Sequence, residues 1–89
     1  MVKQNLTNET KFIVEIKEVH TPYSTTLKFP KAKDPKGLIE TLTRNNFRVE
    51  VRYNEDGSIY KCTCKRFVLK GELQEYTDQV FSDIKPYLN

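Results

Sequence analysis

The stretch that decides the fold is residues 47–68, which read FRVEVRYNEDGSIYKCTCKRFV. Apolar and charged residues alternate from Phe47 to Tyr53, and a second alternating run begins at Ile59. A period of two is typical of strands that bury one face. Between the two runs, residues 54–58 (NEDGS) are turn formers. The pattern therefore predicts a β-hairpin.

Another hairpin precedes this stretch. Apolar and polar residues alternate over residues 12–19 and again over residues 23–29, with Pro22 in the break between them. Residues 1–10 have no apolar periodicity, so we expect a flexible N-terminal arm there. A chain of 89 residues is too short for two independent cores. Residues 11–89 are therefore expected to form a single α+β domain.

Each predicted hairpin is followed by a predicted helix. Asp34 is an N-cap residue placed directly before a proline, and Asn45-Asn46 is a natural helix stop because Asn tolerates the left-handed conformation. Apolar residues recur at helical spacing over residues 72–87. The element order is β-β-α-β-β-α. We expect a four-stranded antiparallel sheet with two helices packed on one face.

The alternation over residues 47–68 also assigns the two faces of that hairpin. Facing the core we expect Phe47, Val49, Val51, Tyr53, Tyr60, Cys62 and Cys64. Facing outward we expect Arg48, Glu50, Arg52, Ile59, Lys61, Thr63, Lys65 and Phe67. The outward set is basic and partly aromatic, which is typical of nucleic-acid-binding surfaces but also of ordinary solvated sheet faces. The candidate macromolecule-binding residues are Arg48, Arg52, Ile59, Lys61, Lys65 and Phe67.

Charge is distributed unevenly along the chain. The formal net charge is +3. Residues 1–70 carry 14 Lys or Arg against 8 Asp or Glu, whereas residues 71–89 carry 1 against 4. The sequence thus predicts a basic body with an acidic final helix.

The two cysteines are expected to have a structural role. Cys62 and Cys64 are two residues apart on a predicted strand, so both thiols point into the apolar layer, where free Cys behaves as a small hydrophobe. A disulfide across one intervening strand residue would be strained. Zinc would need about four ligands, and His20 is far away in the sequence. We therefore expect no metal and no cofactor.

No catalytic constellation can be assembled from the residues present. His20, the one histidine, belongs to a predicted turn and has no nucleophile or paired carboxylate at a meaningful spacing. The three glycines are isolated, so there is no glycine-rich phosphate loop. The sequence predicts that this protein is not an enzyme.

The favoured interpretation is a small binding protein that modulates a host protein by occlusion, as phage and mobile-element accessory proteins do. Abundant Asn, Lys, Thr and Tyr with little Ala and Gly indicate an AT-rich coding sequence, as in low-GC bacteria and their phages. The alternative is a nucleic-acid-binding module that uses the basic face of the 47–68 hairpin. The partner is expected to be a protein, with nucleic acid possible, and the chain to be a monomer or a homodimer.

The expected location is the cytoplasm. No signal-peptide pattern opens the chain, and two cysteines are too few for a disulfide framework of a secreted protein. No apolar run approaches the roughly 20 residues needed to cross a bilayer, so no membrane association is expected.

Overall fold

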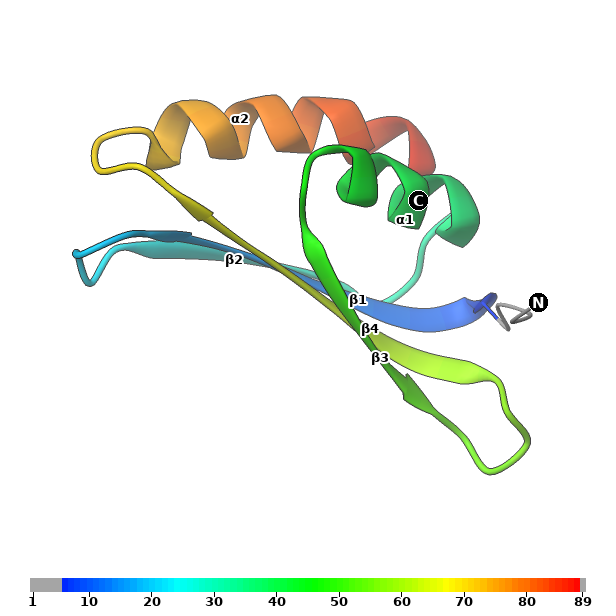
Figure 1. Ribbon diagram of the computed structural model, residues 1–89. Coiled ribbons are helices and arrows are strands. Elements are labelled where there is room, and N and C mark those ends of the chain that lie inside the picture. The colour runs from blue at the N-terminus through cyan, green and yellow to red at the C-terminus, as the bar shows by residue number, and fades with distance from the viewer. Residues whose placement is uncertain (1–5, 89) are drawn as a thin grey trace.

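The computed structural model describes residues 6–88 of the chain, which form one sheet covered by two helices (Figure 1). The strands are β1 (Leu6–Glu18), β2 (Ser24–Phe29), β3 (Arg48–Tyr53) and β4 (Ile59–Val68). The helices are α1 (Pro35–Arg44), α2 (Leu73–Ile84) and a short 3-10 turn, η1 (Lys85–Tyr87). The predicted β-β-α-β-β-α order is confirmed.

The sheet is mixed rather than antiparallel. Its strand order is β2-β1-β4-β3; the two hairpins are antiparallel, but β1 and β4 pair in parallel at the centre. The prediction of an all-antiparallel sheet is therefore wrong at the central pair. The reason lies in the connection, because a helix that returns the chain across one face makes the next strand run in the same direction as the previous one. Since β3 runs with β2, β4 must run with β1.

Strand β1 begins at Leu6, six residues before the alternating run that starts at Phe12. Leu6 pairs with Ile59, and Thr10 is fully buried. The Thr10 hydroxyl donates to the carbonyl oxygen of Ile59 at 2.6 Å and accepts the backbone N–H of Thr7 at 3.1 Å. Residues 6–10 are thus part of the sheet and not of a loose arm, whereas residues 1–5 of that predicted arm lie outside the described residues.

Both helices lie on the same face of the sheet, as predicted (Figure 1). The Asp34 side chain caps α1 by accepting the backbone N–H of Gly37 at 3.1 Å. Asn46 takes the left-handed conformation that ends this helix, with φ of 64°. The core between the helices and the sheet contains, among its fully buried side chains, Phe12, Val14, Ile16, Leu38, Leu42, Cys62, Cys64, Val80 and Ile84.

A β-bulge at the start of β4 reverses part of the predicted side-chain pattern. Arg52 lies opposite Lys61, but the next residue, Tyr53, lies opposite Ile59, so Tyr60 is an extra residue in β4. As a result Ile59 is only 3% exposed and packs in the core, while Tyr60 is 45% exposed. The predictions of an outward Ile59 and of a core position for Tyr60 are wrong, because strict alternation cannot continue through a bulge. Tyr53 keeps the predicted side of the sheet, but at 53% exposed it is not a core residue.

Candidate functional site

The face of the sheet that points away from the helices receives side chains from all four strands. We call it the outer sheet face. Its members are Lys11, Ile13, Glu15, Lys17, Ser24, Thr26, Lys28, Arg48, Glu50, Arg52, Lys61, Thr63, Lys65 and Phe67. Seven of them are Lys or Arg and two are Glu. Neither helix covers this face, so these charges are open to solvent or to a partner.

One row across the outer sheet face consists only of cations. Lys11 of β1 lies beside Lys61 of β4, and Lys61 lies opposite Arg52 of β3. Neighbouring strands are about 4.8 Å apart, so the Cα atoms of these three cationic residues lie within roughly 10 Å of one another. Among residues 6–88, none of the three forms an ion pair. Like charges directly opposite each other destabilise a sheet, and such local conflicts concentrate at functional sites.

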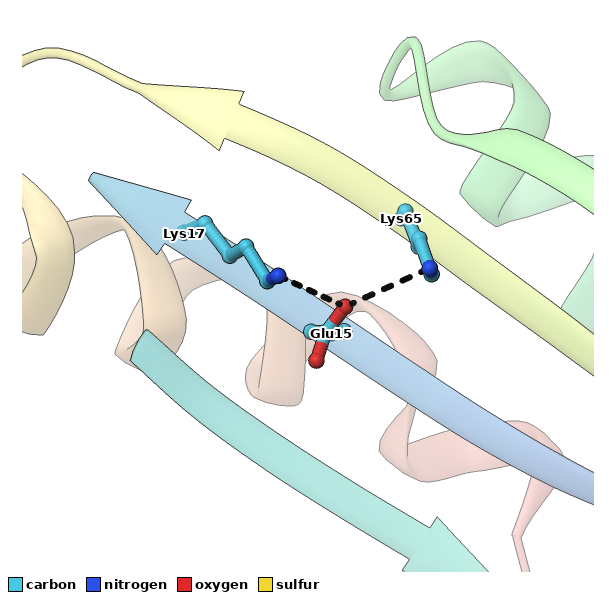
Figure 2. A network of polar contacts seen from close by, with 3 residues as sticks. All are labelled: Glu15, Lys17 and Lys65. Carbon is cyan, nitrogen blue, oxygen red and sulfur yellow. Dashed lines mark ion pairs between the residues drawn. The ribbon is translucent and has the colours of Figure 1, made fainter. Parts of the chain in front are cut away.

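A second row is partly neutralised. Glu15 of β1 lies between Lys17 of the same strand and Lys65 of β4, at 3.8 Å from each ammonium nitrogen (Figure 2). Arg48 lies on the other side of Lys65. Because one carboxylate is shared by two lysines, this part of the face keeps an excess of positive charge.

An exposed aromatic ring lies next to these cations. Phe67 of β4 is 64% exposed and lies beside Lys17 of β1. It is two residues from Lys65, so both side chains point to the outer sheet face. A flat ring flanked by ammonium groups can stack on an unpaired base while the lysines contact its phosphates.

Five of the six candidate residues predicted from the sequence come together on this face. Arg48 lies opposite Lys65 and Arg52 opposite Lys61, with Phe67 at the far end of β4. The sixth, Ile59, is separated from them, because it packs in the core on the other side of the sheet.

The first hairpin also contributes to the outer sheet face, which the sequence pattern did not indicate. Lys11, Lys17 and Lys28 add three cations, and Glu15 adds a carboxylate, next to the predicted set. Their alternation along residues 11–17 and 24–28 was visible in the sequence. Their place beside β4 was not, since it depends on which strands pair.

Arg66 is a cation of β4 with a different role. Its Nη1 donates to the carbonyl oxygen of Asn45 at 2.5 Å and to the hydroxyl of Tyr76. The guanidinium carbon lies 4.3 Å from the centre of the Tyr76 ring, a cation–π contact. This side chain joins β4 to α2 and to the end of α1, so we assign it to the stability of the fold and not to the outer sheet face.

The two cysteines are free thiols and fully buried. Burial raises the pKa of Cys62 to about 11. Burial, with a smaller contribution from Cys62, raises the pKa of Cys64 to about 12. At neutral pH both side chains are therefore protonated thiols, and the reactive thiolate form is scarce.

We expect neither thiol to react with Ellman's reagent in the folded protein at pH 8, and both to react in denaturant. Above about pH 9 the unfolded thiols lose their protons while the folded ones keep theirs, so the free energy of unfolding should fall as pH rises toward 11. Each thiol contributes on the order of 1.4 kcal/mol per pH unit in that range. Urea unfolding at pH 8, 9 and 10 measures the decline, and a Cys62→Ala, Cys64→Ala variant should show a shallower one. Rapid reaction of the native protein with Ellman's reagent would contradict the assignment of both cysteines as buried, protonated thiols.

The remaining candidate groups do not form a further site. His20 takes a positive φ of 61° in the exposed turn between β1 and β2, as expected for a turn residue. Over residues 6–88, no group of three or more His, Cys, Asp or Glu side chains is arranged to hold a metal ion. The helices of this same region are too short or too polar to cross a membrane.

A comparison with models of known protein families found no match, and comparisons with curated proteins and with solved structures found none either. The function of this chain is therefore inferred from the geometry of the outer sheet face.

Proposed function

We propose that this protein is a non-catalytic binding module that holds single-stranded nucleic acid on its outer sheet face. The observation that carries the proposal is the row of Lys11, Lys61 and Arg52, three adjacent cations without an ion pair among the described residues. A polyanion that crosses this row would remove the repulsion between the three charges and release its own condensed counterions. Binding thus turns an unfavourable contact of the free protein into a favourable one.

A single strand fits this face better than a duplex does. Phe67 offers an exposed ring beside Lys17, and ring stacking requires a base that is not already stacked in a duplex. Some domains that bind single-stranded RNA have the same arrangement: helices cover one face of the sheet, and aromatic side chains on the open face stack on bases. That likeness is one of architecture only.

The test is fluorescence anisotropy with a labelled single strand of about 20 nucleotides and with the matching duplex, each at low and at high salt. We expect the single strand to bind more tightly than the duplex and both affinities to fall steeply as salt rises. A Lys36→Ala, Lys85→Ala variant is the matched control, because it removes two exposed charges from the helical layer. Absence of binding to either probe at low salt would refute the proposal.

The second candidate function is to bind a protein partner and block it, as a phage or mobile-element accessory protein would. It is favoured by exposed apolar side chains at one end of the sheet. Phe67 lies beside Lys17, Leu69 directly follows β4, and Tyr23 directly precedes β2. Exposed apolar side chains gathered at one end of a sheet are typical of protein interfaces. In that case, Leu69→Ala should weaken partner binding more than loss of Lys11 does, and the salt dependence should be shallow.

A further inference from the structure

Strand β3 is an edge strand with an open side. It is last in the strand order, so within residues 6–88 only β4 pairs with it. Its sequence, RVEVRY, contains no proline, and the bulge of this hairpin lies in β4, so β3 keeps regular alternation through Tyr53. Edges of this kind are templates for a further strand.

The residues of β3 are complementary to a second copy of themselves. In an antiparallel pairing with a two-fold axis at Val51, Glu50 lies opposite Arg52 of the second copy, and Arg52 lies opposite Glu50 of the second copy. Both pairs are on the outer sheet face. On the inner face, Val51 meets its own copy and Val49 meets Tyr53, a β-branched residue beside an aromatic one, which is a favourable cross-strand pair.

The neighbouring register is not complementary. With the axis at Glu50, this carboxylate would face its own copy, and Arg48 would face Arg52 of the second copy. Both contacts would bring like charges directly opposite each other. The charges of β3 therefore disfavour the register centred on Glu50. An axis at Val49 would also pair Arg48 with Glu50, but it would leave only residues 48–50 of β3 opposite one another, whereas the axis at Val51 pairs residues 49–53.

The inner side of the β3 edge is incompletely covered. A groove of about 250 Å³ lies there, with Val49, Val51 and Tyr53 on its β3 side and Ile39 and Thr43 of α1 across from them. The two valines are only half-buried, and Tyr53 is 53% exposed although it points to the helical side. The Val49 and Tyr53 side chains of a second copy in this register would lie over these same residues.

We propose that two copies of this chain pair through β3, antiparallel about a two-fold axis at Val51, into one continuous eight-stranded sheet. The second copy occupies the open edge of β3 and the groove beside it, and the two copies recognise each other through the Glu50–Arg52 pairs. The pairing would join the two outer sheet faces, yet it does not depend on nucleic-acid binding.

The test uses charge reversal at exposed positions of β3, which leaves the core untouched. Sedimentation equilibrium should find a dimer for the unchanged protein. Glu50→Arg and Arg52→Glu should each raise the dimer dissociation constant at least about tenfold, because every attractive pair becomes a repulsive one. Mixing these two variants should restore a dimer that contains one chain of each, since two arginines then face two glutamates.

Arg48→Glu is the matched control. It makes the same charge change on the same strand and face, but in this register it lies opposite Asn54, beyond the end of β3, so the dimer should be nearly unaffected. Three results would overturn the proposal: a protein that stays monomeric at every accessible concentration, single reversals that still form dimers, or a mixture that stays monomeric. Circular dichroism of each variant confirms that the fold is intact.

Discussion

Replacing Lys11 and Lys61 together with alanine should weaken single-strand binding on the order of 50-fold at 50 mM salt and flatten its salt dependence. Each phosphate contact contributes about 0.7 to the logarithmic salt slope of a single strand, so two lost contacts should lower the slope by about 1.4. The affinities of the variant and of the unchanged protein should converge near 1 M salt. Anisotropy titrations at four or more salt concentrations measure both quantities.

This double variant keeps Glu50 and Arg52, so it separates nucleic-acid binding from the proposed pairing of two copies. The Lys36→Ala, Lys85→Ala control carries the same net charge but alters the helical layer, and its slope should stay close to that of the unchanged protein. The melting temperature of the control should be nearly unchanged, since both of its side chains lie at the surface, and that of Lys11→Ala, Lys61→Ala should be unchanged or slightly raised, since like charges that face each other are removed. Equal loss of affinity in the two double variants would mean that only total charge matters and that the outer sheet face is not the site.

Two phenylalanines of the sheet, Phe12 and Phe67, should respond in opposite ways to alanine. Phe12 is fully buried on the central strand β1, whereas Phe67 is 64% exposed on the outer sheet face of β4. Phe12→Ala should lower the free energy of unfolding by about 3–5 kcal/mol, because it removes a large core side chain and leaves a cavity. That is a large share of the roughly 5–10 kcal/mol expected for a domain of this size.

Phe67→Ala should change the free energy of unfolding by less than about 0.5 kcal/mol. Its effect should be on binding, where loss of one stacked base costs about 1–3 kcal/mol. Urea unfolding and anisotropy on the same two variants give the comparison. If the Phe67→Ala variant binds single strands as tightly as the unchanged protein does, the aromatic ring is not part of the site and binding is purely electrostatic.

The helix boundaries and hairpins were predictable because their signals are local. The Asp34 side chain caps the helix that begins at Pro35, and Asn46 ends it in the left-handed conformation, as its residue type indicates. The alternation on each side of the NEDGS turn likewise produced the β3–β4 hairpin. Each of these features depends on residues only a few positions apart.

The candidate site was predictable in part. Arg48, Arg52, Lys61, Lys65 and Phe67 share one face because alternation sets the face of each side chain within a hairpin. Ile59 was assigned to the wrong face, because the bulge at Tyr60 adds one residue between it and Lys61. A bulge leaves no distinct mark in a pattern of alternating residues.

What the sequence by itself determined is therefore the identity of the strands and helices, their order, and the basic character of one hairpin face. Only the tertiary structure decided that β1 runs parallel to β4, which brings Lys11 beside Lys61 and completes the cationic row. It also decided that Leu6 and Thr10 belong to the sheet, through a pairing and a hydrogen bond to Ile59, about fifty positions along the chain. The physical reason is range: capping, turns and alternation act between neighbours in sequence, whereas strand pairing depends on the burial and hydrogen bonding of segments that meet only when the whole chain folds.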